Sequence, residues 1–141
     1  MNNAKFATAL HILTLLDLSE GERLSSEWIA GSINLNPALV RKEISILRKL
    51  GFISSKEGNG GGCTLARPSA DILLSDIYKA VRQSPLLGRT NTPNPSCSVG
   101  RQINQHLDEL YTEAELSLTS RLEKKTLKEF SRKFQSATSD F

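Results

Sequence analysis

Apolar residues recur at helical spacing in four stretches of the chain. Residues 4–18 carry a wide apolar face, and residues 28–33 carry a shorter one. Residues 37–50 place apolar side chains at steps of four, three and three, which forms a single stripe along a helix. Residues 98–122 repeat such spacing over the longest distance. The pattern therefore predicts a mainly α-helical protein.

Two of these helices lie a few residues apart and begin at good capping residues. Ser25 or Ser26 can cap the first, because a side-chain oxygen there accepts a backbone N–H of the first turn. Asn36 can cap the second, and Pro37 fits its first position, where a missing N–H costs nothing. Gly51 can end that helix in a left-handed conformation. The spacing predicts a helix-turn-helix.

A small β-hairpin is predicted directly after the second helix. Residues 52–55 have strand character, residues 58–62 form a glycine-rich loop, and residues 63–66 form a return strand that ends before Pro68. Glycine-rich loops also cradle nucleotide phosphates, but this one lacks the following helix and the Gly-Lys-Ser/Thr ending of a P-loop. The order of elements favours a winged helix-turn-helix.

The second helix carries small and basic residues on the face opposite its apolar stripe. A recognition helix needs such a face, since its first residues approach base edges and its Lys and Arg side chains neutralise phosphates. A solvated helix face has the same composition, so the pattern alone leaves both interpretations open. We predict that base edges meet Ala38, Arg41, Lys42 and Ser45. The rest of the predicted DNA-binding set is Ser25, Ser26, Asn36, Pro37, Lys56, Asn59, Gly60 and Gly61.

The apolar stripe of residues 98–122 is long for a chain of 141 residues. Burial against a second copy would cover it, so we expect a dimerisation helix. A core helix of a monomer is the alternative. Two copies would present their recognition helices about 34 Å apart, to an inverted repeat in DNA. The predicted interface comprises Val99, Ile103, Leu107, Leu110, Ala114 and Leu118.

Composition and charge are those of a globular protein. Hydrophobic residues make up 38% and charged residues 23% of the chain, and the net charge of +3 permits nucleic-acid binding without requiring it. No apolar run approaches the roughly 20 residues that span a bilayer, and no secretory pattern opens the chain, so we expect a cytoplasmic protein. Paired carboxylates, a Ser-His-Asp arrangement and a metal cluster are not recognisable, so we expect neither an enzyme nor a cofactor.

Cys97 is one of two cysteines in the chain, and it lies where a loop meets the predicted long helix. A helix N-terminus stabilises a thiolate, which lowers the thiol pKa and raises its reactivity. Cys97 is therefore a candidate sensor of oxidants or electrophiles. An inert, partly buried cysteine is the alternative.

Several motifs together resemble one bacterial family. The segments LRKLGFISS, GNGGGCTLARP, ILLSDIYKAV and NPSCSVG occur in the order found in the Rrf-two family of winged helix-turn-helix transcriptional regulators. The resemblance implies a dimeric repressor, and it is greatest to a single-cysteine subgroup without an iron–sulfur cluster. Two positions depart from the family pattern: Cys63 stands where relatives often have Tyr, and Glu57 stands where they often have Arg, a role that Lys56 could take.

We therefore predict four segments. Residues 1–82 form the winged helix-turn-helix domain, 83–97 a mobile loop, 98–134 the dimerisation helices and 135–141 a loose tail. The predicted function is that of a homodimeric, sequence-specific DNA-binding repressor that responds to thiol chemistry at Cys97. A winged-helix protein-interaction module that does not bind DNA is one alternative. A regulator controlled by a small ligand is another.

Overall fold

Helix α1 (Lys5–Leu18) lies at the centre of the part of the molecule that we call the head, which is formed by α1 to α4, the hairpin and α6. The computed structural model describes residues 4–134. Ala9, Ile12 and Leu13 of α1 are completely buried, because α2, α3, α4, α6 and β2 all pack around this helix. The wide apolar face predicted for this first helix is therefore buried in the core of the head.

The helix-turn-helix consists of α2 (Ser26–Ile33) and α3 (Pro37–Lys49). Ser25 caps α2 and Asn36 caps α3, as their sequence positions indicated. The apolar stripe of α3 faces the core, where the side chains of Val40, Ile44 and Leu47 are buried. Gly51 follows α3 with φ of 88°, the left-handed conformation expected of it.

The hairpin consists of β1 (Ile53–Lys56) and β2 (Gly62–Leu65), paired antiparallel with Ile53 opposite Leu65. Leu24 forms an isolated antiparallel β-bridge with Cys63 of β2, in which the two backbones exchange two hydrogen bonds. Gly62 has φ of +130°, and a Cβ there would lie 2.7 Å from the Leu24 oxygen. The winged helix-turn-helix fold predicted from the sequence is confirmed.

A short 3₁₀ helix (Ser69–Asp71) leads from the hairpin to α4 (Leu74–Val81). Ser75 does not cap this helix but is buried within its first turn, and the Asp76 carboxylate accepts from the Leu73 N–H at 3.1 Å. The helix packs chiefly against α1 and α5 rather than supporting the hairpin, because Leu74, Ile77 and Val81 face that core.

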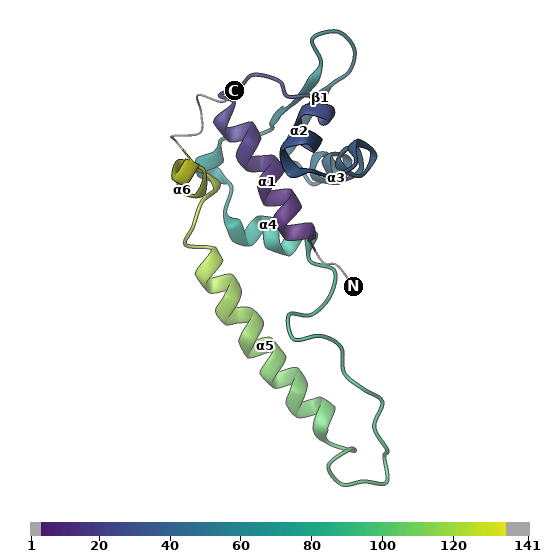
Figure 1. Cartoon of the computed structure of the whole chain (residues 1–141). Coiled ribbons are helices and arrows are strands. Elements are labelled where there is room, and N and C mark those ends of the chain that lie inside the picture. The colour runs from purple at the N-terminus through teal and green to yellow at the C-terminus, as the bar shows by residue number, and fades with distance from the viewer. Residues whose placement is uncertain (1–3, 135–141) are drawn as a thin grey trace.

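The segment after α4 runs outward from the head, and helix α5 (Ile103–Leu122) runs back beside it from the far end of the molecule toward the head (Figure 1). The sequence predicted that this helix begins at residue 98, but residues 98–102 form turns. The chain then returns to the head, where α6 (Leu127–Ser131) buries Leu127 completely against the core. No helix within residues 4–134 is long and apolar enough to cross a membrane. The predicted loose tail, 135–141, lies outside the described residues.

Candidate DNA-binding surface

The exposed face of α3 carries the residues predicted to contact base edges. Ala38, Arg41 and Lys42 are exposed, and Ser45 is half-buried on the same helix. Pro37 and the Asn36 cap leave the first turn of α3 open to solvent. The structure thus brings these residues together at the surface, at the end of α3 where a recognition helix contacts bases.

Two acidic residues partly balance the basic charge of α3. Glu43 lies 3.2 Å from the Lys5 ammonium, and both side chains are partly buried, so this pair ties α3 to α1. Glu27 of α2 lies 3.5 Å from the Arg41 guanidinium, and both side chains are more than half exposed. An exposed pair of this kind is weak, so Arg41 can exchange Glu27 for a phosphate or a base. No local pattern predicts this pair, because its members stand 14 residues apart in the chain.

The predicted phosphate-contacting residues of the turn have structural roles as well. The Ser25 hydroxyl oxygen accepts from the Trp28 N–H at 3.1 Å. The side-chain Oδ1 of Asn36 accepts from the Ala38 N–H at 2.8 Å. Ser26 donates to the Glu27 carboxylate at 3.3 Å. The capping oxygens of Ser25 and Asn36 are thus already used, and the remaining Ser25 hydroxyl proton and Asn36 amide protons face solvent as donors.

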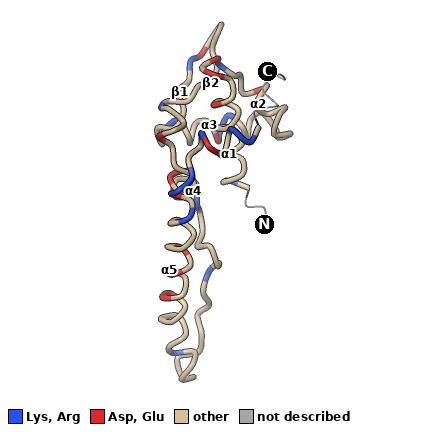
Figure 2. Tube along the Cα trace, turned by 90° about the vertical axis from the view of Figure 1, so that its left-hand side faces the viewer, with Lys and Arg blue, Asp and Glu red and all other residues tan. Residues whose placement is uncertain are grey.

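The predicted contact residues of the hairpin lie at its exposed tip. Lys56 ends β1 and is followed immediately by Glu57, so opposite charges adjoin near the tip of the hairpin (Figure 2). Asn59 and Gly60 are exposed, and the Gly61 N–H closes the turn on the Gly58 oxygen at 2.9 Å. A Cβ at Gly61 would lie 2.3 Å from the Lys56 oxygen, so the tight turn requires glycine there.

Cys97 lies in the turns that precede α5, not at the first residue of the helix. Its carbonyl accepts from the Arg101 N–H at 2.8 Å, and its Sγ lies 3.5 Å from the Gly100 nitrogen. The backbone N–H groups of Gly100 and Val99 lower the pKa of the exposed Cys97 thiol. The expected direction of the shift is therefore found, but these turns, rather than the helix terminus, cause it.

Cys63 has the opposite environment. It is buried in β2, and desolvation raises the pKa of its thiol. Its Sγ lies 3.7 Å from the Ser55 hydroxyl across the hairpin. Cys97 precedes α5 at the far end of the molecule from the hairpin (Figure 1), so the two thiols of one chain cannot form a disulfide in this fold.

The described residues do not fit an iron–sulfur cluster. Such a cluster takes three or four protein ligands, usually cysteines. Cys97 is the one cysteine of the segment between α4 and α5, and no group of three His, Cys, Asp or Glu side chains within residues 4–134 could hold a metal ion.

The face of α5 predicted to dimerise is partly exposed in the single chain. No residue of α5 is buried, and Ile103 and Leu110 are exposed while Leu107, Ala114 and Leu118 are half-buried. These five residues lie on one side of the helix, at steps of three or four. Val99, the sixth predicted residue, lies in the preceding turns and is 65% exposed.

Comparison with known proteins supports the fold and the function class. Residues 2–133 match the Rrf2 family model, described as an iron-dependent transcriptional regulator. YwnA of Bacillus subtilis, a proposed HTH-type transcriptional regulator, is 39% identical over 130 residues, which are 92% of this chain and 96% of YwnA. A crystal structure of a proposed DNA-binding protein is 35% identical with a TM-score of 0.71, over 89% of this chain and 97% of that one.

A further structure shares the fold alone. CymR, the global cysteine regulator of B. subtilis, is 22% identical with a TM-score of 0.69, over 94% of this chain and 96% of CymR. The family match covers most of the chain, and the exposed basic helix and the hairpin described above are the elements of a winged helix-turn-helix. The chain therefore belongs to the Rrf2 family of DNA-binding transcriptional regulators and is not an enzyme.

Proposed function

We propose that this protein is a homodimeric repressor that binds an inverted-repeat operator through α3 and the hairpin. The observation that carries the proposal is the pairing of two exposed features in one chain. One is the basic outer face of α3, and the other is the partly exposed apolar side of α5. The first suits DNA, and the second suits a second copy of the same chain.

In the proposed complex, α3 enters the major groove. Ala38, Arg41, Lys42 and Ser45 meet base edges, and Arg41 leaves Glu27 to do so. Lys56, Asn59 and the adjoining glycines follow the backbone at the hairpin tip, where the glycines allow close approach. The Glu57 carboxylate would repel phosphate, so the attraction between the hairpin and the DNA phosphates comes from the Lys56 ammonium.

In the proposed dimer, α5 of one chain packs against α5 of the other. Ile103, Leu107, Leu110, Ala114 and Leu118 form the seam, and Val99 extends it into the turns. Dimerisation then sets the separation of the two α3 helices, and with it the spacing of the operator half-sites.

Cys97 is the proposed sensor in this assembly. The thiol is exposed and its pKa is lowered, which are the properties of a cysteine that reacts with oxidants. Oxidation of the thiolate to a sulfenic acid by a peroxide or hypochlorite would place a new polar group in the turns that begin α5. The change would favour one arrangement of the two heads over another.

Gel shifts with genomic DNA fragments, including the promoter beside the protein's own gene, test the proposal. Reduced protein, hypochlorite-treated protein and the Cys97→Ser variant are compared. We expect specific binding by reduced protein and its loss on oxidation, with the variant resistant. Specific binding that ignores the oxidant would discard the thiol switch and leave control by a small ligand. Absence of specific binding in every arm would favour a protein-interaction module.

A further inference from the structure

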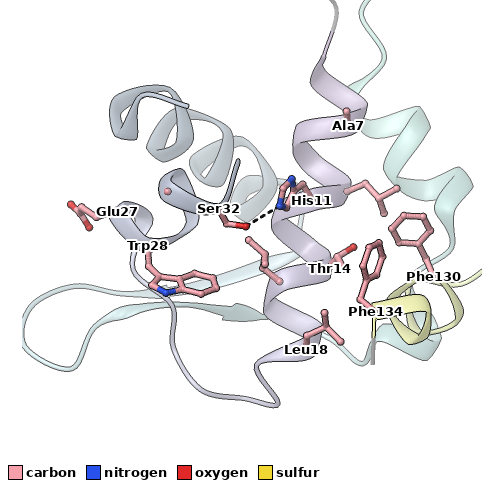
Figure 3. A pocket seen from close by; sticks show the side chains of 12 residues that line it. Ala7, His11, Thr14, Leu18, Glu27, Trp28, Ser32, Phe130 and Phe134 are labelled. Atoms are coloured by element: carbon pink, nitrogen blue, oxygen red, sulfur yellow. Dashed lines mark hydrogen bonds between the residues drawn. The ribbon is translucent and has the colours of Figure 1, made fainter. Parts of the chain in front are cut away.

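A cavity of about 800 Å³ lies on the face of α1 between α2 and α6. Figure 3 shows the Trp28 indole of α2 on one side of it and, on the other, the rings of Phe130 in α6 and of Phe134, which follows α6. Leu10 and Leu18 of α1 complete an apolar wall. The volume lies within the range of about 300–1,000 Å³ that small-molecule sites occupy.

Polar groups converge on this cavity at a few points. Thr14 is 6% exposed, and its hydroxyl has no hydrogen-bond partner within residues 4–134. Figure 3 shows that the Thr14 oxygen lies on the side of α1 that faces Phe134. A threonine in the middle of a helix commonly donates to a backbone oxygen of the preceding turn. The Thr14 hydroxyl is instead a buried polar group whose hydrogen bond remains to be made.

Charge in the lining limits what the cavity can hold. Among the described residues, no Lys or Arg lines it, and Glu27 stands at its edge, so an anion finds no favourable partner among them. His11 donates or accepts a hydrogen bond with the Ser32 hydroxyl at 3.1 Å, and burial lowers the pKa of its imidazole, which favours the neutral form. The Glu27 carboxylate is partly balanced by Arg41. An uncharged molecule fits these walls best.

We propose that this cavity binds an uncharged, largely apolar small molecule that makes one hydrogen bond with Thr14, and that its occupancy controls DNA binding through α2. The control rests on the proposed function, because Trp28 lines the cavity from α2, and α2 packs against the recognition helix α3, which carries Arg41. A molecule that displaces α2 changes the position of Arg41. Such a molecule shifts the equilibrium between the original and the displaced position of α2 only as far as it binds these two positions unequally.

Fluorescence gives a direct test, because Trp28 is the single tryptophan of the chain. Full-length protein is titrated with N-phenyl-1-naphthylamine, an uncharged apolar dye, and energy transfer from Trp28 is followed. We expect saturable transfer that naphthalene and 2-naphthol each displace. These two competitors differ by one hydroxyl. Absence of saturable transfer would overturn the proposal.

The Thr14→Val variant, which keeps the side-chain shape, isolates the hydrogen bond. We expect its affinity for 2-naphthol to fall about tenfold, equivalent to one hydrogen bond, and its affinity for naphthalene to change less than about twofold. Thr8→Val is the matched control, since Thr8 is buried in the same helix but does not line the cavity. Equal losses for both competitors, or for both variants, would contradict a hydrogen bond at Thr14.

Two further experiments test whether the cavity holds another occupant and whether its occupancy changes DNA binding. Deletion of residues 135–141, which follow Phe134, should leave dye affinity within about twofold. Binding only after this deletion would show that the cavity holds the chain's own C-terminal segment, which overturns the proposal. Saturating 2-naphthol should change operator affinity at least about fivefold, and an unchanged affinity would overturn the control. If no DNA binds under any condition, the proposed function fails while dye binding still reports on the cavity.

Discussion

The Tyr78 hydroxyl lies 3.2 Å from each oxygen of the Glu115 carboxylate, which joins α4 of the head to α5. Arg82 also pairs with Glu115, and the Leu86 N–H donates to it at 3.1 Å. One carboxylate thus connects α4, α5 and the start of the segment between them. If α5 dimerises as we propose, this cluster sets the orientation of each head relative to the dimer axis.

Replacement of Glu115 should loosen that connection. Desolvation raises the pKa of Glu115, but hydrogen bonds from Leu86, Arg82 and Tyr78 outweigh it and hold the pKa below its usual value. The carboxylate therefore contributes stability above its unfolded pKa of about 4.3, and this contribution is lost as pH falls through the lower folded value. We expect Glu115→Gln to lower the free energy of unfolding by on the order of 1 kcal/mol at pH 7.

Urea denaturation at pH 7 and at progressively lower pH measures this effect. The difference between wild type and Glu115→Gln should shrink as the pH falls. Tyr78→Phe is the companion variant. It removes the hydroxyl but keeps the ring, which makes an edge contact with Phe6 at a centroid distance of 6.1 Å. A difference that grows in acid would contradict the assignment of the charge to Glu115.

The two basic residues of α3 should affect DNA binding in different ways. Arg41→Ala should cost about 1–3 kcal/mol and relax the choice of base at one operator position, as loss of a base contact does. Lys42→Ala should weaken binding to all sequences and reduce the slope of log K against log salt by about one. Fluorescence anisotropy at several salt concentrations distinguishes them. The control is Lys124→Ala, since Lys124 is exposed in the turn between α5 and α6 and not on α3. Equal behaviour of all three variants would argue against α3 as the recognition helix.

Leu110 is the sharpest test of the proposed dimer. It is 52% exposed in the single chain and lies in the middle of the apolar side of α5. Leu110→Glu would bury a carboxylate in the seam, so we expect monomers in analytical ultracentrifugation and weaker operator binding. Leu116→Glu is the matched control, since Leu116 is 64% exposed on a different side of the same helix. A dimer that survives the first change but not the second would place the interface on the other side of α5.

The two thiols should react at very different rates. Cys97 is exposed with a lowered pKa, so its thiolate forms at lower pH than that of an ordinary cysteine, whereas Cys63 is buried with a raised pKa. Iodoacetamide labelling of native protein at pH 7, followed by mass spectrometry, should modify Cys97 several-fold faster than Cys63. The fast phase should disappear in Cys97→Ser and persist in Cys63→Ser. Its persistence in Cys97→Ser would exclude Cys97 as the reactive thiol.

Gly62 should resist substitution more than Gly58 of the same hairpin. Gly62→Ala would combine a positive φ with a Cβ 2.7 Å from the Leu24 oxygen, so Leu24 must move away from β2. Gly58→Ala shares the positive φ but meets nothing within 4 Å. We expect losses of unfolding free energy of about 1 kcal/mol for Gly58→Ala and about 2–3 kcal/mol for Gly62→Ala in urea titrations. Equal losses would mean that the close approach of Leu24 relaxes without cost.

The sequence by itself determined the winged helix-turn-helix, because the signals for it are local. Asn36 followed by Pro37 defines the start of α3, Gly51 its end, and the glycines between two short apolar segments define the hairpin. Each acts on its own few residues of backbone, so no distant partner is needed to interpret it. The family was indicated by the resemblance of motifs along the chain, among them GNGGGCTLARP and NPSCSVG.

Only the tertiary structure decided the relationships between distant residues. The apolar spacing indicated a helix from residue 98, but it starts at Ile103, since turns fill the residues between. Glu27 with Arg41, Tyr78 with Glu115, and the cavity between Trp28 and Phe134 join residues far apart in the chain. Such contacts depend on how helices pack, and helical periodicity specifies which face of a helix is apolar, not which neighbour that face meets.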